Sequence, residues 1–254
     1  MLTFIVPLKS KRVATSWPHV CRLFKRAIAS ACAQTSAKFR VIAVCNEIPD
    51  GDWKDPRLEF ISIDSEVPAN AGARQRRDDV SRKRLIGLNR AVELSCSHVM
   101  FLDSDDCVSN KLAEHVAKNP LSNGWYLRSG YFYSEKQKRL HLERWRFSKW
   151  CGSSYIVRPE HLDYVERRND GIHMCHTRMT NEFKSRGHPL QALPFHGGIY
   201  CVSHGENFHD YEPILWPKNP LLSGLRRLLF HRALTDSISE EFGLYPVSGK
   251  DQNR

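Results

Sequence analysis

A short apolar run that ends in a cluster of aspartates constrains this chain more than any other feature. Residues 99–102 have the length and composition of a buried strand, and the next four residues are Asp103, Ser104, Asp105 and Asp106. Carboxylates this close repel one another and lose hydration when buried, so folding alone gives no reason to gather them. A divalent cation gives one, because it takes carboxylate oxygens and leaves positions open for phosphate oxygens. The cluster therefore predicts a metal–phosphate site, although aspartate is also a common turn former and helix N-cap.

Composition places the chain among globular proteins. Its 254 residues are 41% hydrophobic and 10% aromatic. No apolar run approaches the ~20 residues that span a bilayer. The N-terminus has neither a basic segment nor a small-residue cleavage site, so we expect a first strand there and a cytoplasmic location. The eight cysteines include no CxxC pair, which favours reduced, buried thiols over a zinc site.

The net charge of +10 indicates a polyanionic partner. Nucleotide phosphates, nucleic acid, anionic lipid and an acidic glycan would all satisfy this charge. Charge alone does not choose among them.

The first half of the sequence alternates strand-like and helix-like segments. We expect strands at 4–8, 40–45, 58–63 and 99–102 and a helix at 19–34. A densely charged, solvated segment at 74–84 is expected to run into a second helix, with Leu85, Leu88 and Val92 facing inward. This alternation is typical of a parallel, doubly wound sheet. In such sheets ligands bind outside the carboxyl ends of the strands, where the aspartates would lie.

The second half is less regular and richer in aromatic residues. Residues 125–132 and 140–145 are expected to be strands around a charged turn, and 198–203 a further strand. A helix over 174–186 would end at Gly187, a plausible C′ glycine. A basic, leucine-striped helix is expected near 221–228.

Five short segments follow one another in a recognisable order. They are Phe4–Pro7, the Ala-Gln-Thr at 33–35 before the strand at 39–42, Arg84–Gly87, Phe101–Asp106 and His204–Asn207. Together they resemble the family 2 glycosyltransferases, although Leu85 stands where that family carries asparagine.

The resemblance implies an α/β fold of the GT-A type. Such a fold has a Rossmann-like, mostly parallel sheet with helices on both faces, and a smaller mixed region on the acceptor side. We expect 1–110 to be the nucleotide-sugar-binding half and 111–215 the acceptor-side and catalytic half of one domain. Residues 216–254 would form a basic C-terminal helix and tail.

The resemblance also assigns roles to the aspartate cluster. Asp103 would contact the ribose of the nucleotide, and Asp105 would bind the metal on its diphosphate. Asp106 would lie near the donor sugar, where catalysis occurs, and Ser104 would belong to the donor site between them.

Three further residues join the donor site by the same resemblance. Pro7 would close the first strand beside the nucleotide, and Arg84 would lie next to the diphosphate as a fixed cation. His204 would be a later ligand of the metal or of phosphate. Trp150 and the residues that follow it could line the acceptor pocket, because aromatic faces stack on sugars.

Two departures from the family pattern concern the contact with the nucleobase and the identity of the catalytic base. The family usually has an acidic pair after the second strand, whereas this chain has Asn46, which can still hydrogen-bond a base edge. The catalytic aspartate usually lies about eleven residues before a glycine, and that position here holds His176. Histidine can deprotonate a hydroxyl. Asp170 is the second candidate, and His173 is another.

These expectations describe a metal-dependent glycosyltransferase of glycan or polysaccharide biosynthesis. It would use Mn²⁺ or Mg²⁺ and a nucleoside-diphosphate sugar, with UDP-sugar as the first expectation, and would transfer the sugar to a glycan, lipid-linked or other hydroxyl acceptor, with inversion. The basic C-terminal helix could rest on the inner face of a membrane.

Three alternatives stay open. A nucleotidyltransferase of similar fold would carry a glycine in the loop after the first strand, and 9–12 has none. A basic nucleic-acid-binding protein would explain the charge but not the aspartates, so no nucleic acid is expected. The third alternative is a non-catalytic relative of the transferases, because the position of the catalytic base is altered.

Overall fold

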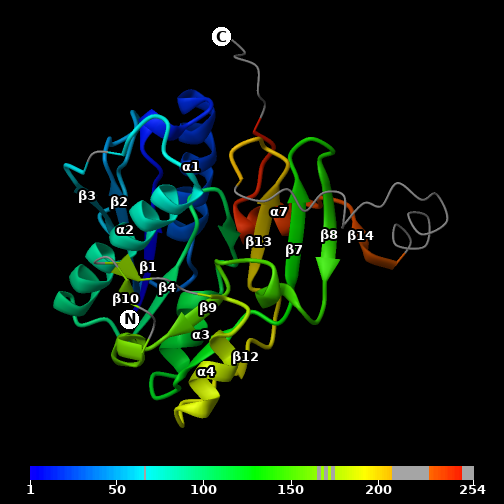
Figure 1. Cartoon of the computed structure of the whole chain (residues 1–254). Helices are drawn as coiled ribbons and strands as arrows, with labels where there is room; N and C mark the ends of the chain where they lie inside the picture. Colours follow the sequence, from blue (N-terminus) through cyan, green and yellow to red (C-terminus); the bar gives the residue numbers. More distant parts are fainter. Residues whose placement is uncertain (66, 165–166, 169–170, 173–174, 208–228, 248–254) are drawn as a thin grey trace.

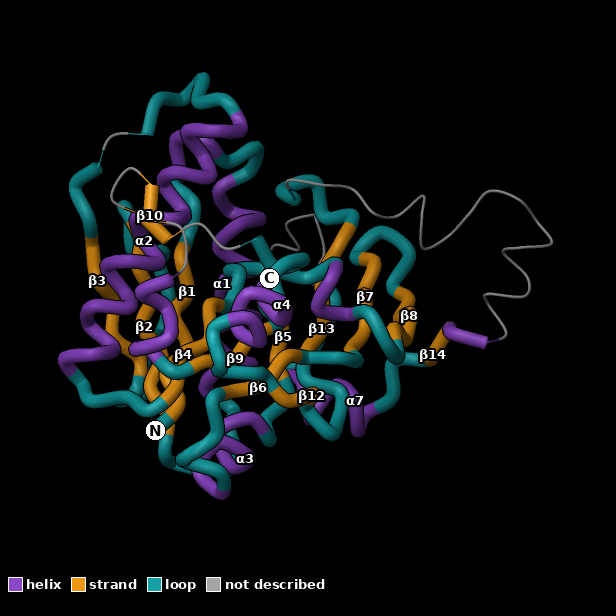
Figure 2. Tube along the Cα trace, turned by 60° about the horizontal axis from the view of Figure 1, so that its bottom comes forward, coloured by secondary structure: helices purple, strands orange, loops and turns teal. Residues whose placement is uncertain are grey.

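Two β-sheets organise the protein, a main sheet of seven strands and a second sheet of five, with the main sheet on the left of Figure 1 and the second on the right. The structure is a computed structural model that describes residues 1–65, 67–164, 167–168, 171–172, 175–207 and 229–247. In the second view the two sheets again lie next to each other (Figure 2).

The main sheet contains the parallel strands that the sequence predicts. Its order is β12-β6-β9-β4-β1-β2-β3, and β1, β2, β3 and β4 run parallel to their neighbours in this group. The strands are β1 (Leu2–Pro7), β2 (Phe39–Cys45), β3 (Leu58–Ser62), β4 (His98–Phe101), β6 (Gly124–Tyr126), β9 (Tyr155–Val157) and β12 (Gln191–Ala192). β9 pairs antiparallel with both β4 and β6. The predicted α/β class with a mostly parallel sheet is confirmed.

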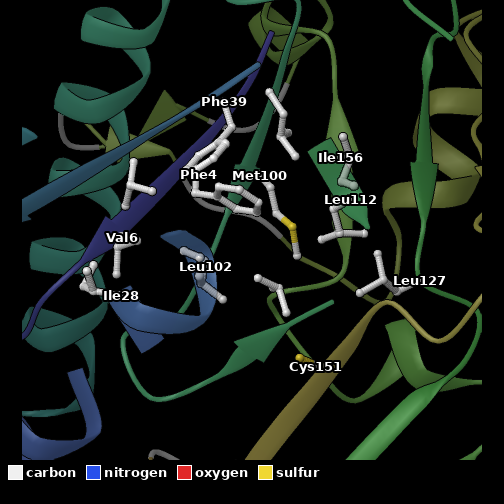
Figure 3. Packing of buried hydrophobic residues seen from close by; sticks show 14 of the residues in the cluster. Phe4, Val6, Ile28, Phe39, Met100, Leu102, Leu112, Leu127, Cys151 and Ile156 are labelled. Carbon is white, nitrogen blue, oxygen red and sulfur yellow. The ribbon is translucent and has the colours of Figure 1, made fainter. Parts of the chain in front are cut away.

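Helices cover both faces of this sheet, because its central strands bury side chains on both sides. In β1, Phe4 and Val6 belong to one core cluster and Ile5, between them, to another. The first cluster includes residues of α1 (Trp17–Cys32) and α3 (Leu112–Lys118), and the second includes residues of α2 (Ala73–Glu93) and α4 (Met179–Ser185). Figure 3 shows the first cluster, in which Phe4 and Phe39 lie beside Met100.

Helix α2 approaches β1 closely at Gly87. A Cβ atom at this position would lie 2.4 Å from the Ile5 Cγ2 atom and 3.3 Å from the Val44 Cγ2 atom. The glycine therefore lets the helix backbone pack directly on the sheet. This contact brings Arg84, one helical turn earlier, toward the end of β4.

The second sheet is mixed and begins directly after the aspartates. Its order is β14-β8-β7-β13-β5, with β13 parallel to β7 and the other pairs antiparallel. Its strands are β5 (Cys107–Val108), β7 (Gly130–Ser134), β8 (Arg139–Glu143), β13 (Gly198–Val202) and β14 (His231–Arg232). Because β4 ends at Phe101 and β5 begins at Cys107, residues 102–106 connect the two sheets.

The remaining elements are short. A hairpin joins β10 (Arg167–Arg168) and β11 (Gly171–Ile172), and α7 (Asp236–Phe242) packs under the second sheet through Phe242. The described residues also form the 3-10 helices η1 (Lys11–Val13), η2 (Phe147–Lys149) and η3 (Pro159–Tyr164). No helix among the described residues combines the length and the apolar character needed to cross a membrane.

Three sequence expectations need correction. The single strand expected over 125–132 is two strands, β6 and β7, because the chain leaves the main sheet at Leu127 and enters the second at Gly130. Val92 is 54% exposed, since the buried side of α2 at this end passes through Leu88 and Ala91. The helix expected over 174–186 covers only Met179–Ser185. The leucine stripe at 221–228 lies outside the described residues.

Candidate functional site

The carboxyl ends of β1 and β4 form the base of the candidate site. The two strands are parallel neighbours, and the Leu102 N–H donates to the Ile5 carbonyl at 2.9 Å just as β4 ends. This register brings the loop that follows Pro7 beside the aspartates that follow Leu102. The crevice outside strand ends is where open α/β sheets bind ligands.

A cavity of about 360 Å³ lies at these strand ends. Six residues predicted from the sequence are among those that line it: Pro7, Arg84, Asp103, Ser104, Asp105 and His176. Trp150, which was expected in the acceptor pocket, also lines it. Asn46, Asp106 and His204 are not among the lining residues.

Asp103 forms an ion pair with Arg84 across the cavity wall. The Arg84 Nη2 atom lies 3.0 Å from the Asp103 Oδ1 atom, and the guanidinium also lies 5.7 Å from the centroid of the Phe101 ring. Burial raises the pKa of Asp103 above its ordinary value, and the Arg84 cation opposes this shift. A fixed guanidinium beside a carboxylate suits the recognition of ribose and phosphate together.

Gly152 allows Asp103 to occupy this position. A Cβ atom at residue 152 would lie 2.9 Å from the Asp103 Oδ2 atom, closer than real Cβ contacts. The sequence offers no signal for this requirement, because it arises from two segments about fifty residues apart.

Asp105 faces His204, which comes from the loop after β13. The His204 Nε2 atom lies 2.9 Å from the Asp105 Oδ2 atom, and the His204 side chain is fully buried behind Asp105. Burial raises the pKa of Asp105, but His204 and Lys9 outweigh it, so this pKa lies below its ordinary value. The loop turns sharply at this point, with φ values of 62° at Ser203 and 82° at Gly205.

The carboxylate of this pair fits a divalent cation that takes further ligands from a phosphate. Carboxylate oxygens are the ligands that Mn²⁺ and Mg²⁺ prefer, and such ions are often held by only one or two protein carboxylates together with phosphate oxygens. No group of three or more such side chains occurs within the described part of the chain. The His204 Nδ1 atom accepts a hydrogen bond from the Glu206 N–H at 3.2 Å, so Nε2 carries the ring proton toward Asp105. A metal on Nε2 would require that proton to move to Nδ1 and would break the hydrogen bond from the Glu206 N–H, so the Asp105 carboxylate is the group that could take the ion, with His204 behind it.

Asp106 turns away from the cavity into the protein. Its side chain is buried and accepts hydrogen bonds from the Ser153 hydroxyl at 2.7 Å, the Cys201 N–H at 3.0 Å and the Cys151 thiol at 3.4 Å. Burial and the neighbouring charges of Asp105 and Asp103 raise its pKa well above the ordinary value. The sequence expectation had Asp106 near the donor sugar, whereas the structure shows a carboxylate whose contacts are internal.

His176 lies in the cavity wall with its ring and backbone both anchored. The Nε2 atom is 3.1 Å from the Lys149 carbonyl, and the Tyr155 hydroxyl donates to the His176 carbonyl at 2.6 Å. Because a carbonyl only accepts, Nε2 carries the proton of the neutral ring and Nδ1 keeps the lone pair. Burial lowers the pKa of His176 below its ordinary value, so the ring is neutral at pH 7. Asp170 and His173 lie outside the described residues.

Asn46 directs its side chain toward the segment after β3. Its Nδ2 atom donates to the Ser65 carbonyl at 2.8 Å and lies 3.1 Å from the Ser65 hydroxyl. The Oδ1 atom is buried without a hydrogen-bond partner. Asn46 therefore fixes the loop near 63–65 in the structure.

Lys9 and Glu206 also line the cavity, although no sequence motif predicts a role for either. The Lys9 Nζ atom donates to the Glu206 Oε2 atom at 2.9 Å and to its carbonyl at 2.8 Å. Glu206 also accepts from the N–H groups of Thr15 and Ser16 at the start of α1. The sequence shows a basic loop after β1 and a glutamate in the segment 204–207. It does not show that they meet, because they lie almost two hundred residues apart.

A buried lysine fixes the loop that carries Lys9. Lys83 of α2 donates to the Leu8 carbonyl and to the Asp79 Oδ2 atom, each at 2.7 Å. Burial lowers the pKa of Lys83, although the Asp79 carboxylate opposes the shift. Helix α2 thus holds the end of β1 through Lys83 and the end of β4 through Arg84.

Comparison with known proteins finds similarity at the level of structure. No protein-family model matches the sequence, and no curated protein matches it. The chain is similar to S. aureus TarS 1–349 in complex with UDP-GlcNAc, with 12% identity and a TM-score of 0.49 over 94% of this chain and 69% of that chain. For TarS 1–349 alone the values are 12% and 0.48, over 79% and 60%, so this chain spans about 60% of that protein's length.

A second similar structure comes from Desulfovibrio desulfuricans G20, a protein with a proposed assignment as a nucleotide-diphospho-sugar transferase. Its identity is 12% and its TM-score 0.38, over 94% of this chain and 92% of that chain. These similarities concern the arrangement of the chain.

Proposed function

We propose that this protein is a metal-dependent glycosyltransferase of the GT-A type. It would transfer a sugar from a nucleoside-diphosphate sugar to a hydroxyl acceptor with inversion. The observation that carries the proposal is one cavity at the carboxyl ends of β1 and β4 that combines the Asp103–Arg84 pair with Asp105 beside His204. A ligand with ribose hydroxyls, two phosphates and a sugar has groups that match each of these.

The donor would place its diphosphate near the cations of the cavity. Lys9, Arg77 and Arg84 all line it, and they provide positive charge where a nucleoside diphosphate would depart. Because Lys9 is held by Glu206 and Arg84 by Asp103 before the reaction, these two cations would stabilise the charge of the leaving group without reorganisation. The family resemblance makes UDP the first nucleotide to test.

Asp105 would hold Mn²⁺ or Mg²⁺ through its carboxylate, with His204 behind it, and the ion would neutralise developing charge on the diphosphate. Asp105 reaches the cavity, while His204 supports it from behind. Arg84 would remain on Asp103 and orient that carboxylate toward the ribose.

His176 would accept the proton of the acceptor hydroxyl. Its Nδ1 atom has the lone pair, and the low pKa keeps the ring neutral at pH 7. As the acceptor oxygen bonds to the anomeric carbon, the bond from that carbon to the diphosphate oxygen breaks. The proton passes to Nδ1, and the nucleoside diphosphate leaves with the bonding electrons. Trp150 would provide an aromatic face for the sugar rings.

Calorimetric titration of UDP, GDP, CDP and dTDP, each with and without Mn²⁺, tests the proposal. We expect one diphosphate to bind only with metal, and Asp105→Ala to abolish that binding. Asp52→Ala removes an exposed carboxylate from a surface ion pair and serves as the matched control. Absence of metal-dependent binding in the wild type, or unchanged binding in Asp105→Ala, would overturn the donor site.

A further inference from the structure

Trp145 is an exposed indole in the loop between β8 and η2. It is 67% exposed, whereas Trp125 is buried in the core. The other large apolar side chains that are exposed in the described part of the chain come from separate elements, among them Ile48, Val92 and Leu121. Trp145 is thus a single exposed aromatic ring, and its significance depends on the groups around it.

The loop holds Trp145 in a fixed position. The Glu143 Oε1 atom accepts hydrogen bonds from the N–H groups of Trp145 and Arg146, each at 3.0 Å. The Phe147 N–H donates to the Arg128 carbonyl at 3.1 Å and ties the loop to the segment before β7. A ring held in place before binding loses little conformational entropy when a ligand arrives.

One arginine contacts the indole, and two more flank Trp145 in the sequence. The Arg128 guanidinium lies 5.1 Å from the centroid of the Trp145 ring, which is a cation–π contact. Arg144 and Arg146 flank Trp145 in sequence, and Arg128, Arg144 and Arg146 are all exposed. Glu143 is the one acid in the segment 143–149, and its Oε1 atom is engaged by the loop backbone. The surface around Trp145 is therefore positively charged.

This surface lies close to the cavity along the chain. The 3-10 helix η2 connects Trp145 to Trp150, which lines the cavity. Five residues keep the two Cα atoms within about 18 Å of each other even if the chain were fully extended. A ligand of several sugar rings is long enough to span that distance.

We propose that Arg128, Arg144, Trp145 and Arg146 form an outer acceptor subsite for an anionic glycan. The proposal rests on the proposed function, because it assigns the acceptor of that reaction to glycans with carboxylate or phosphate groups. The C–H face of a sugar ring packs on the free face of the indole, and its acidic groups pair with the arginines. A membrane surface fits less well, since an interfacial anchor needs several apolar side chains together and this loop exposes one.

The subsite is tested with oligosaccharide probes in the absence of donor. The probes are tetragalacturonate, which carries carboxylates, a phosphorylated maltotetraose, neutral maltotetraose, and inorganic polyphosphate, which has charge but no sugar ring. Chemical-shift changes of the Trp145 indole N–H report binding directly. We expect both acidic oligosaccharides to bind at least about tenfold more tightly than maltotetraose and polyphosphate. A difference between carboxylate and phosphate probes then identifies the acidic group.

Variants separate the ring from the charges. We expect Trp145→Ala to weaken tetragalacturonate binding about tenfold and Trp145→Phe to retain most of it. Arg144→Gln with Arg146→Gln should reduce its salt dependence, because Arg128 remains. Lys136→Gln with Lys138→Gln removes two exposed charges from the turn of the β7–β8 hairpin and is the matched charge control. Equal loss in that control, equal binding of polyphosphate, or binding only to vesicles of anionic phospholipid would overturn the proposal.

The result is separable from that for the donor site. Trp145 is not among the cavity-lining residues, so Trp145→Ala should leave metal-dependent UDP binding unchanged. Glycan binding that depends on Trp145 in a protein that binds no nucleotide would reject the proposed function and keep the subsite. Nucleotide binding without glycan binding would reject the subsite alone.

Discussion

The carboxylate of Asp106 accepts a hydrogen bond of 2.7 Å from the hydroxyl of Ser153. The same Ser153 oxygen accepts a hydrogen bond of 2.9 Å from the backbone N–H of Asp103. The other Asp106 oxygen accepts from the N–H of Cys201 in β13 at 3.0 Å. The third aspartate of the cluster therefore fixes the backbone of the first and joins it to the second sheet.

Ser153→Ala should reduce both stability and nucleotide binding. It leaves the Asp103 N–H without a partner and the buried Asp106 Oδ2 atom with only the weak Cys151 thiol donor, which costs about 1–3 kcal/mol of unfolding free energy. Urea denaturation measures this loss. Ser185→Ala, which removes an exposed hydroxyl from α4, should change stability by less than about 0.5 kcal/mol. If the two variants are equally stable, the Ser153 bridge contributes nothing to the fold.

Gly152→Ala should weaken nucleotide binding while leaving the fold nearly intact. The added Cβ meets only the Asp103 carboxylate, at 2.9 Å, and that side chain can move aside. The move pulls Asp103 from Arg84, so we expect the Kd for the diphosphate to rise about tenfold. Calorimetry gives the Kd and thermal unfolding gives the stability. Unchanged affinity would show that the position of Asp103 does not matter for binding.

Gly87→Ala should have the opposite profile. Its Cβ would lie 2.4 Å from the Ile5 Cγ2 atom inside the core, where neither the strand nor the helix can yield easily. Overpacking of this kind costs about 1–3 kcal/mol of unfolding free energy. The loss should appear in urea denaturation without ligand. A variant as stable as the wild type would mean that α2 shifts freely on the sheet.

The location of the site could be predicted from the sequence because strand ends are encoded locally. An apolar run followed by aspartates predicts a strand and the polar edge where it stops, and parallel strands place such edges together. The pairing of β1 with β4 then brings Pro7 and Asp103 to one cavity. Each of these steps depends on residues that are close in sequence or on a general rule of topology.

The direction of individual side chains could not be predicted in this way. The sequence does not indicate which of the two carboxylates, Asp105 or Asp106, faces the cavity. Asp106 faces the interior because the hydrogen-bond donors of Ser153 and Cys201 lie there. Asn46 turns to Ser65, and Lys9 meets Glu206 almost two hundred residues later. Val92 follows the expected helical period but lies at the edge of the buried stripe. Such details depend on long-range packing, which cannot be predicted from hydrophobic periodicity or from the spacing of motifs.

The rate of sugar transfer should depend on the protonation of His176. Burial lowers its pKa below the ordinary value of 6.5, so the base form already dominates at neutral pH. We expect kcat/KM to be flat around pH 7 to 8 and to fall about tenfold per pH unit once the pH drops below that lowered pKa. His176→Gln should lose most of the activity and its acidic limb while it retains UDP binding. His188→Gln, an exchange in the turn after α4, is the control. An unchanged acidic limb in His176→Gln would assign the base to another residue, with Asp170 next.

Stability itself should fall in mild acid because of a second buried histidine. His98 is fully buried in β4, where its Nε2 atom donates to the Ser122 carbonyl at 2.9 Å, and burial lowers its pKa from 6.5 to about 4. The unfolded chain therefore binds a proton at this residue below pH 6.5, whereas the folded chain does so only near pH 4. The stabilisation is present above pH 6.5 and is lost as the pH falls from 6.5 to 4. Its size is about 3 kcal/mol of unfolding free energy.

Urea midpoints of the wild type and His98→Gln at pH 7.5, 6 and 5 measure this contribution. Glutamine does not titrate and can still donate to the Ser122 carbonyl, so the variant should lose less stability on acidification than the wild type. The difference between the two proteins removes the effects of carboxylates and of the other histidines, which both contain. Parallel losses in the two proteins would mean that His98 takes up its proton equally in the folded and unfolded states.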